Sequence, residues 1–555
     1  MMASRIWAVG LLLVGLAWMS YDHYRPWLNF HAEALACAGV LVLTVGVLLE
    51  RGASRSWPRI CIWLLLAAVA PWAWWALGIG LFAGDALVAS MYLMAFAAAV
   101  VVGHHWAQRV GPWQAVLAWF VALVAGLSAT VGLVQWLRLT EPFGMYVVQT
   151  DIGERALGNI GQPNQLGTLL LMGMAALLML FETRRLGRVA FVFCVGYLTL
   201  VLAMTQSRAA LLSTAAMTIF LLVKSSRLTR LRPAPLLVWA LTVVVLLLSV
   251  PLFAEWLLLG EARGVAGMTL TSDRLQIWGQ VLAGIVQSPW VGYGWNQTPT
   301  AHVAGALAVP GTLTYTNAHN LALDLVAWNG IPLGLLWIGL VAWWLWSRLR
   351  AVQEPAAIAA LAALLPLTIH SLVEYPFAYA YFLILGGLLI GVVEACHPGS
   401  RVASLRRRWV WVMLVPWAVA GVFAANEYLL VEEDFRIVRF ENMRIGQTPP
   451  EYQAPQIRLL SQLGEMLYAA RARPAPNMPS SEIDRLRKVA LRFPWGALHL
   501  RYAYTLALNG DPEGAAHHMR VVRAMFGDAY YQAALTELRE VARRHPQARA
   551  VLELL

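Results

Sequence analysis

Residues 235–258 read PLLVWALTVVVLLLSVPLFAEWLL, in which Glu255 is the only charged side chain. A helix needs about 20 apolar residues to cross a hydrocarbon core of about 30 Å. Of the 555 residues, 59% are hydrophobic and 13% are charged, whereas soluble domains carry roughly 25% charged residues. Twelve further ranges are long and apolar enough to be spans: about 5–20, 34–50, 59–78, 86–106, 114–137, 164–182, 188–205, 208–223, 320–346, 355–373, 376–395 and 409–426. The sequence therefore predicts an all-α fold, a polytopic membrane helical bundle of about 13 transmembrane helices. The ranges 188–205 and 208–223 are so closely linked that the number of spans there stays open.

The distribution of Lys and Arg between the connecting loops predicts the orientation. If the N-terminus is cytoplasmic, the inside loops hold 18 of these residues and the outside loops between spans hold six. Basic loops stay on the cytoplasmic side, so we expect the N-terminus inside and the C-terminus outside. The net charge of +11 is then mostly a topology signal and indicates no nucleic-acid partner. No small-residue cleavage site follows the first span, which argues against a cleavable signal peptide.

The composition changes sharply after the last apolar range. We predict a transmembrane catalytic domain over residues 1–426, with long outside loops at about 138–163 and 259–319, and a helical domain outside the membrane over residues 427–555. In this second domain, small residues face each other across the turn at 509–512 (NGDP). That pattern resembles a tetratricopeptide-type hairpin, and an irregular helical domain fits equally well.

The outside loop 259–319 contains an amphipathic segment. Its apolar residues at helical spacing are Leu275, Trp278, Val281, Leu282 and Ile285. Ser272 or Asp273 can cap the start of such a helix. We expect a short helix that lies along the membrane surface or tucks between spans.

Two polar motifs stand at the outside ends of apolar ranges. In GNIGQPNQ (158–165), Pro163 suits the first turn of a helix, which places Gln162 and Asn164 beside a helix N-terminus that attracts anions. A simple helix cap is the alternative. In TQSR (205–208), Arg208 is costly near the membrane unless it is paired or functional, and its planar fork matches phosphate oxygens. A snorkelling interfacial arginine is the alternative.

Two basic residues of the loop 259–319 pose similar choices. Arg274 either binds phosphate or pairs structurally with Asp273. His319, in NAHN (317–320), begins a predicted span. A helix N-terminus disfavours the imidazolium form, so His319 should stay neutral and able to accept a proton. A neutral histidine is the usual general base, and a plain helix cap is the alternative.

A fourth motif, HSLVEYP (370–376), crosses the outside end of the eleventh span. Glu374 lies one helical turn beyond His370, and Tyr375 precedes a proline. A local His–Glu pair that closes the helix is the alternative. Together, two arginines, amide side chains, a neutral histidine and a tyrosine suit the binding of a pyrophosphate and the deprotonation of a hydroxyl. They do not suit redox chemistry or proteolysis.

Several other kinds of chemistry find no support in the sequence. It contains neither an Asp-x-Asp motif nor a P-loop, which argues against a nucleotide-sugar donor and against coupling to ATP. The spacing of the four cysteines fits no metal site. The acidic cluster 432–434 is interpreted as a solvated face. We therefore expect no cofactor and no metal ligands.

The motifs resemble, in their order, those of bacterial protein O-oligosaccharyltransferases, which belong to the superfamily of O-antigen ligases and polymerases. The motifs are Gly161-Gln162-Pro163-Asn164, Ser207-Arg208, Asp273-Arg274, Gly292-Tyr293-Gly294-Trp295-Asn296, His319-Asn320 with Gly330 downstream, and Glu374-Tyr375-Pro376. The resemblance covers about residues 20–395. The C-terminal domain is also similar to the extension of the protein-glycosylating branch.

The resemblance implies a bacterial inner-membrane enzyme with a periplasmic active site and periplasmic C-terminus. Its donor would be an oligosaccharide on undecaprenyl diphosphate, transferred en bloc with inversion and without a metal. Its acceptor would be a Ser or Thr hydroxyl of a periplasmic or secreted protein, type IV pilin being one acceptor that the family implies.

Roles for seven residues follow from the same resemblance. His319 would be the catalytic base, and Arg208 and Arg274 would hold the diphosphate and stabilise its charge as it leaves. The residues that would position donor or acceptor are Gln162, Asn164, Glu374 and Tyr375.

Two other functions stay open at this point. An O-antigen ligase that transfers glycan to lipid A core would use the same donor and the same catalytic residues. A transporter of the lipid-linked glycan would place ionisable residues at mid-membrane depth. Here they gather at the outside ends of the spans, which counts against transport.

Overall fold

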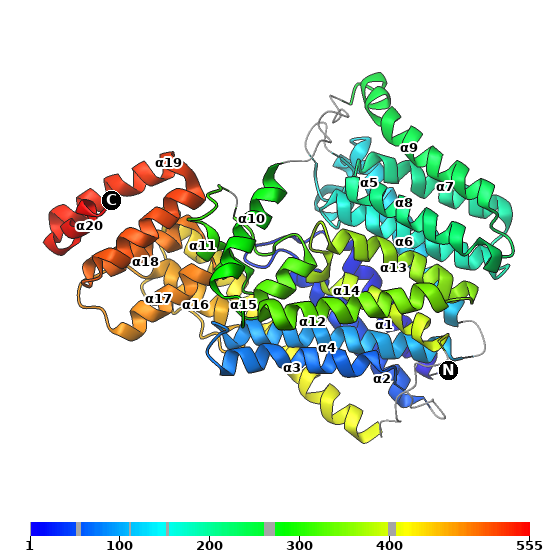
Figure 1. Ribbon diagram of the computed structural model, residues 1–555, viewed down its shortest axis with the longest axis horizontal. Coiled ribbons are helices and arrows are strands. Elements are labelled where there is room, and N and C mark those ends of the chain that lie inside the picture. The colour runs from blue at the N-terminus through cyan, green and yellow to red at the C-terminus, as the bar shows by residue number, and fades with distance from the viewer. Residues whose placement is uncertain are drawn as a thin grey trace. The chain divides into compact units, whose positions relative to one another are not determined.

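The computed structural model describes residues 2–50, 57–109, 113–150, 155–259, 272–312, 314–397 and 407–555, and its regular elements within these ranges are helices. The long helices are α1 (Met2–Met19), α2 (Phe30–Leu49), α3 (Ile60–Ala76), α4 (Ala83–Ala107), α5 (Trp113–Trp136), α6 (Pro163–Glu182), α7 (Arg188–Met204), α8 (Arg208–Val223), α9 (Pro233–Trp256), α10 (Ser272–Gln287), α12 (Leu321–Ala351), α13 (Pro355–Ser371), α14 (Ala380–Ala395), α15 (Arg407–Met443) and α19 (Pro512–Arg544) (Figure 1). The shorter ones are α11 (Thr298–Gly305), α16 (Ser461–Arg471), α17 (Ser480–Arg492), α18 (Gly496–Leu508) and α20 (Arg549–Glu553).

The chain forms two compact units. The first comprises residues 1–66, 92–270 and 342–418, and the second comprises residues 67–91, 271–341 and 419–555. Four of the five boundaries between the units fall inside long helices, because α3, α4, α12 and α15 each contribute residues to both. The predicted division at residue 426 into a transmembrane domain and a periplasmic domain stays a prediction.

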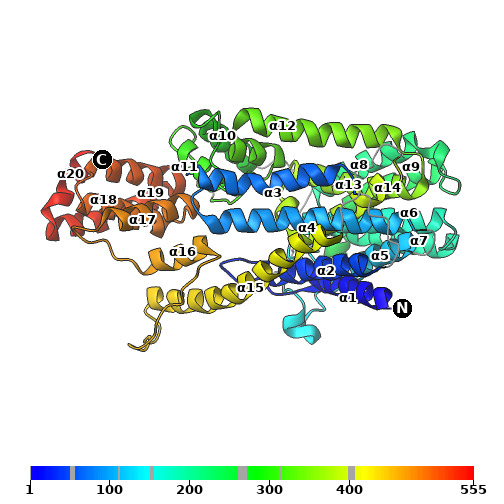
Figure 2. The same cartoon turned by 90° about the horizontal axis from the view of Figure 1, so that it is seen from below.

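The first unit is a helical bundle around α6. This helix is buried along almost its whole length and packs against α5, α7, α8 and α13 (Figure 1). Small residues permit the close approach: a Cβ on Gly173 would lie 2.3 Å from the Cβ of Ala125, and one on Gly167 would lie 2.8 Å from the Cβ of Ala210. Such small-residue contacts are typical of helix packing in membranes. Helices α1 and α2 form a second close pair in this unit (Figure 2).

The apolar helices agree with a membrane protein. Among the residues that the structure describes, seven helices are long and apolar enough to cross a bilayer, and six shorter apolar helices coincide with the remaining predicted ranges. Helix α9 is the most apolar of the seven, and only 22% of its apolar window is buried. An apolar helix that buries so little of its surface in protein fits a lipid environment. The number of membrane crossings stays a prediction.

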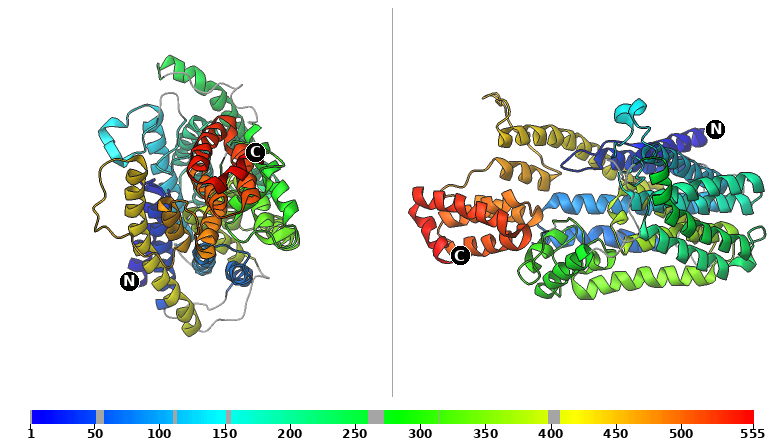
Figure 3. Two further views of the ribbon diagram at one scale, coloured as in Figure 1. Left: turned by 90° about the vertical axis from the view of Figure 1, so that its left-hand side faces the viewer. Right: turned by 90° about the horizontal axis from the view of Figure 1, so that it is seen from above.

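The second unit contains a stack of helices at its C-terminal end. Helix α18 packs against both α17 and α19 (Figure 3, orange to red). The α18–α19 hairpin turns at Gly510, whose φ is +84°, and Asp511 caps α19 by accepting a 2.8 Å hydrogen bond from the Gly514 N–H. The turn expected at residues 509–512 thus joins two packed helices, and the resemblance to a tetratricopeptide unit stays a prediction.

The acidic cluster 432–434 is not a wholly solvated face, so that interpretation is wrong for Asp434. Its side chain is 1% exposed and forms an ion pair of 2.7 Å with Arg471. Tyr452 donates a further 2.6 Å hydrogen bond to the same carboxylate. Both partners follow Asp434 by many residues, and the helix α15 that carries it continues without a break to Met443. Local charge patterning could not reveal partners that only the fold supplies.

The amphipathic segment of the loop 259–319 is a helix, α10, as predicted. Its apolar residues divide between two faces: Val281 and Ile285 are buried, whereas Leu275 and Leu282 are exposed. The spacing suggested a single apolar face, but the apolar residues of α10 form two. One face is buried and also includes Ile277, and the other is exposed. The predicted caps, Ser272 and Asp273, lie outside the described side chains.

Candidate functional site

Gln162 and Pro163 start α6 as the sequence predicts. The Gln162 side chain accepts a 3.0 Å hydrogen bond from the Gln165 N–H, so it is the cap of the helix. The preceding residue, Gly161, has φ of +78°, and a Cβ there would lie 3.1 Å from Nε2 of His23. The capping alternative is therefore realised for Gln162, and Asn164 lies in the first turn of the helix.

Asn164 joins three of the sequence motifs within the first unit. Its side-chain oxygen accepts a 2.7 Å hydrogen bond from Ser207 Oγ, and its amide donates a 3.3 Å hydrogen bond to Glu374 Oε1. These partners lie 43 and 210 residues away along the chain. We call Ser207, Asn164 and Glu374 the amide relay.

The amide relay also brings two helix N-termini together. Ser207 caps α8 by accepting a 3.1 Å hydrogen bond from the Ala210 N–H, and Arg208 is the first residue of that helix. Asn164 stands in the first turn of α6. Helix N-termini carry free N–H groups and partial positive charge. With the guanidinium of Arg208, this region of the first unit suits an anion such as a diphosphate.

A row of aromatic rings connects Tyr375 to α6. Tyr375 stacks on Tyr379 with ring centroids 5.7 Å apart, and Tyr379 stacks on Tyr381 at 5.5 Å. The Tyr381 hydroxyl donates a 3.1 Å hydrogen bond to Gln165 Oε1. Burial raises the pKa of Tyr375, although a hydrogen bond with Tyr379 opposes the shift. Tyr375 is therefore a neutral phenol that can donate a hydrogen bond to a ligand.

His370 and Glu374, the pair expected to close α13, both make contacts with α6. His370 Nδ1 lies 2.9 Å from Thr168 Oγ, and Glu374 belongs to the amide relay. The Glu374 N–H donates a 2.8 Å hydrogen bond to the His370 carbonyl, which ends the helix. The motif thus ends α13 through its backbone and holds α6 through its side chains.

Two structural residues of the first unit escaped the sequence reasoning. His23 places Nε2 2.8 Å from the Asn159 carbonyl oxygen, 136 residues away, and Nδ1 2.8 Å from Asn29 Oδ1. Asn159 in turn donates 2.9 Å hydrogen bonds to the carbonyls of Met19 and Tyr146. These contacts shape the turn that precedes Gln162. The only signal in the sequence is the density of polar and aromatic residues after the first span.

In the second unit, His319 occupies an unusual backbone conformation. Its φ is +53°, a left-handed region that few non-glycine residues adopt and in which histidine is enriched. The next residue caps α12, because Asn320 Oδ1 accepts hydrogen bonds from the N–H groups of Ala322 (2.9 Å) and Leu323 (3.3 Å). The capping role considered for His319 therefore belongs to Asn320.

Trp278 links the helix of Arg274 to the turn that carries His319. The Trp278 indole N–H donates a 3.0 Å hydrogen bond to the carbonyl of Ala318, the residue before His319. Arg274 precedes Trp278 by four residues in α10, and side chains four apart on a helix are neighbours. The fold of the second unit thus joins the helix that carries Arg274 to the residue that precedes His319.

The Gly292–Asn296 motif supports the helix that follows His319. Tyr293 and Gly294 each donate a 2.9 Å backbone hydrogen bond to α12, to the carbonyls of Ala327 and Trp328. Helix α12 is kinked at Gly330, whose φ is +75°, and a Cβ there would lie 2.4 Å from the backbone of Trp290. The motif is therefore structural, and glycine is required at the kink.

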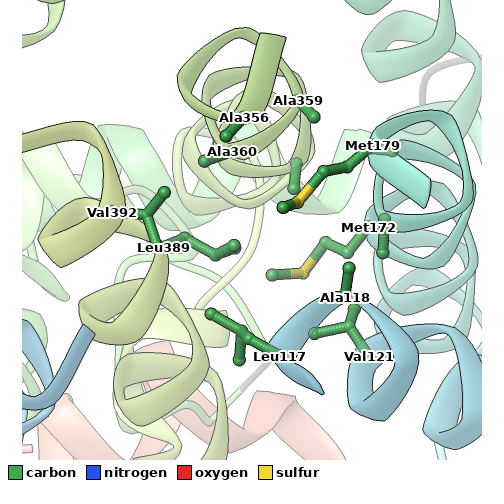
Figure 4. A pocket seen from close by; sticks show the side chains of 13 residues that line it. Leu117, Ala118, Val121, Met172, Met179, Ala356, Ala359, Ala360, Leu389 and Val392 are labelled. Atoms are coloured by element: carbon green, nitrogen blue, oxygen red, sulfur yellow. The ribbon is translucent and has the colours of Figure 1, made fainter. Parts of the chain in front are cut away.

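A small apolar hollow of about 30 Å³ lies inside the first unit, between α5, α6, α13 and α14 (Figure 4). Met172 and Met179 of α6 line it together with alanines of α13. Met172 is nine residues after Pro163, about 13 Å along the helix, and the lining offers no charged side chain. This hollow is thus separate from the polar residues at the start of α6.

The chain matches three known sequence families. One is described as an O-antigen ligase (residues 189–338), one as a protein glycosylation ligase (156–181), and one as the C-terminal part of a virulence factor membrane-bound polymerase (358–539). The first range contains Arg208, Arg274 and His319. The second range contains Asn164, the middle residue of the amide relay, and the third contains Glu374.

Two relatives come from Acinetobacter baylyi. A general O-oligosaccharyltransferase is 28% identical over 535 residues, which cover 94% of this chain and 92% of the relative. A ComP-specific O-oligosaccharyltransferase is 30% identical over 283 residues, half of each chain. The apolar helices and these matches define a multi-pass membrane glycosyltransferase. Within that class, the chain is similar to the bacterial protein O-oligosaccharyltransferases and to the O-antigen ligases.

Proposed function

We propose that this protein transfers an oligosaccharide en bloc from undecaprenyl diphosphate to Ser or Thr hydroxyls of periplasmic or secreted proteins. The observation that carries the proposal is the hydrogen bond from Trp278 to the Ala318 carbonyl, which ties the helix of Arg274 to the residue before His319. A base next to a phosphate ligand is what transfer from a diphosphate carrier requires. The relatedness to a general O-oligosaccharyltransferase over 94% of the chain supports a protein acceptor.

The proposed reaction is a single displacement with inversion. His319 takes the proton from the acceptor hydroxyl, whose oxygen bonds to the anomeric carbon of the first sugar. The bond from that carbon to the phosphate oxygen breaks, and undecaprenyl diphosphate leaves with the electron pair. Arg208 and Arg274 neutralise the charge that develops on the diphosphate. Because two guanidinium groups supply this charge, we infer a metal-independent mechanism.

In this proposal the amide relay and Tyr375 help to bind and position the substrates. Asn164, Glu374 and Ser207 hold the start of α8 and with it Arg208, while Gln162 and Tyr375 contact donor or acceptor. In this proposal the protein lies in a bacterial inner membrane and its candidate residues face the periplasm. The excess of basic residues in the inside loops, 18 against six, supports this orientation. Residues 427–555 then form a periplasmic helical domain.

Ligation of O-antigen to lipid A core is the second candidate. It uses the same donor and the same base, and the match to an O-antigen ligase family over residues 189–338 favours it. Transport of the lipid-linked glycan is disfavoured, because the predicted site residues stand at the ends of apolar helices rather than within them.

Mass spectrometry tests the proposal directly. The chain is expressed in bacteria that make a defined lipid-linked glycan but lack both an O-oligosaccharyltransferase and an O-antigen ligase, with type IV pilin as a first acceptor. We expect glycan on Ser or Thr of periplasmic proteins and none on lipopolysaccharide. Glycan on lipopolysaccharide alone would establish the ligase, and glycan on neither would overturn both.

A further inference from the structure

The turn that carries His319 is held at a single peptide by two other side chains. Trp278 donates its indole N–H to the Ala318 carbonyl at 3.0 Å, and the Ala318 N–H donates to Asp324 Oδ1 at 2.9 Å. Ala318 itself is fully buried. The backbone C=O and N–H of Ala318 are therefore bound by side chains from two different helices, α10 and α12.

Asp324 is in turn held by a buried chain of hydrogen bonds. Thr298 donates from Oγ to Asp324 Oδ1 at 2.6 Å, and Trp328 donates its indole N–H to Thr298 Oγ at 2.8 Å. Asp324 and Thr298 are both 0% exposed. A hydrogen-bonded carboxylate in such a place orients its partners firmly, because the low local dielectric strengthens each bond.

The capping of α12 does not require Asp324. Asn320 already accepts from the N–H groups of Ala322 and Leu323, so the first turn of the helix has its cap. Asp324 instead reaches back out of the helix to Ala318. Its second oxygen, Oδ2, has no hydrogen-bond partner in the part of the chain that the structure describes. A buried carboxylate is costly, and here its bonds serve the turn rather than the helix.

The left-handed φ of His319 makes this support significant. A non-glycine residue persists in that region only where its surroundings hold it there. The Ala318 peptide is the direct link between those surroundings and the His319 backbone. Rotation of that peptide would redirect the imidazole and would change its spacing from Arg274, which shares α10 with Trp278.

We propose that Asp324 and Trp278 are positioning residues for the transfer reaction. Asp324 holds the backbone of His319 in the orientation that aims its imidazole at the acceptor hydroxyl. Trp278 sets the spacing between His319 and Arg274, so that base and diphosphate ligand act on the same donor. The inference rests on the proposed function of His319 and Arg274.

Steady-state kinetics of the purified full-length chain in nanodiscs test the inference. The donor is lipid-linked glycan extracted from the expression host, and the acceptor is the protein found glycosylated in that host. For Asp324→Leu and Trp278→Phe we expect kcat to fall about 100-fold, because a misplacement of about 1 Å costs that much. The KM for the donor should stay within about twofold, since the phosphate ligands are retained.

A conservative variant separates positioning from mere stability. Asp324→Asn keeps an oxygen that can accept from Ala318 and Thr298, so it should recover most of the lost kcat. Its NH2 group would stand where Oδ2 has no partner, so the melting temperature should still fall. Recovery of kcat without recovery of stability is a result that a purely structural role would not produce.

Two matched controls lie in the same unit. Trp74→Phe removes an indole hydrogen bond of 2.9 Å to the Val291 carbonyl. Glu427→Leu removes a carboxylate that accepts from the N–H groups of Arg458, Leu459 and Leu460. Both controls should leave kcat unchanged after correction for folded protein.

The outcomes distinguish this inference from the function on which it rests. An active wild-type protein whose Asp324 and Trp278 variants match the controls would overturn the positioning roles alone. An equal loss of kcat in Asp324→Asn and Asp324→Leu would also overturn the role of Asp324. If the wild-type chain transfers no glycan, the proposed function fails and the inference fails with it.

Discussion

The two units hold their candidate residues in different ways. In the first unit, side chains bind one another directly: Ser207, Asn164 and Glu374 form the amide relay across three helices. In the second unit, side chains bind a backbone: Trp278 and Asp324 hold the peptide of Ala318 and so present His319. A ligand site can thus be built either from linked side chains or from a strained turn fixed on both sides.

The difference has a consequence for substitution. Loss of one side chain in the amide relay removes a contact but leaves Arg208 on the same helix. Loss of a side chain that holds the Ala318 peptide removes a restraint on the backbone of His319. Without that restraint, His319 can leave the left-handed region. We therefore expect the first unit to respond to mutation mainly in donor binding and stability, and the second mainly in turnover.

The largest effect should come from His319 itself. His319→Ala removes the proposed base, and the rate of glycan transfer should fall by about 10²- to 10⁴-fold. Donor binding should persist, because Arg208 and Arg274 remain. The measurement is initial-rate kinetics with a parallel binding assay for undecaprenyl diphosphate. Normal transfer by the variant would remove the base from the mechanism and make the turn merely structural.

The arginines should come next. Arg208→Ala and Arg274→Ala each remove one group that stabilises the leaving diphosphate, so each should lower kcat by about 10²- to 10³-fold. Lysine at either position should restore only part of the rate, because an ammonium lacks the planar fork that matches phosphate oxygens. Kinetics of the four variants check this. Full activity of both lysine variants would mean that charge alone matters.

A smaller effect is expected in the amide relay. Asn164→Leu removes the amide that contacts Ser207 and Glu374, which should lower the free energy of unfolding by about 1–3 kcal/mol and weaken donor binding. Thermal unfolding in detergent and a donor-binding assay measure the two effects. Asn426→Leu is the control, because the Asn426 amide donates a hydrogen bond to the Val422 carbonyl of its own helix on an exposed surface. Equal changes in both variants would contradict the relay.

The smallest effect concerns acid stability of the second unit. Burial lowers the pKa of His302 to about 4, and the ring stacks on Tyr315 at 4.0 Å. An unfolded histidine titrates near pH 6.5, so between about pH 6.5 and 4 the unfolded chain binds the extra proton. The free energy of unfolding should therefore fall as the pH is lowered through that window, by roughly 3 kcal/mol for this residue.

His302→Phe checks the acid prediction, because phenylalanine keeps a ring against Tyr315 and cannot be protonated. Its unfolding free energy, measured from pH 7 to pH 4, should depend less on pH than that of the wild type. An unchanged slope would show that His302 is not responsible. His499, whose pKa is lowered to about 3 by burial, contributes a similar dependence in both proteins.

Much of the fold could be predicted from local patterns. Apolar runs such as 235–258 are helices because only a helix satisfies every backbone group in lipid. The hairpin at Gly510 follows from turn residues between two amphipathic segments. The candidate residues Arg208 and His319 could be found because polar motifs at helix starts are conspicuous in an apolar chain. The seven site residues all came from such motifs.

The supporting residues could not be predicted in the same way. Asp324 and Trp278 lie inside helical patterns, where a carboxylate or an indole gives no sign of its partner. Asp434 was misjudged for the same reason, since Arg471 reaches it from 37 residues away. Residues that act by supporting others are visible only through the contacts they make.

By itself, the sequence determined that the chain is a helical membrane protein and which helix ends carry polar motifs. It also determined which residue types could bind a diphosphate and accept a proton. These follow from hydropathy, charge and residue chemistry, all of which are local. The tertiary structure decided that Asn164 meets Ser207 and Glu374, and that Trp278 joins the helix of Arg274 to the turn of His319. Hydrogen bonds need partners placed within a few tenths of an ångström, and only the packing of helices distant in the sequence supplies that placement.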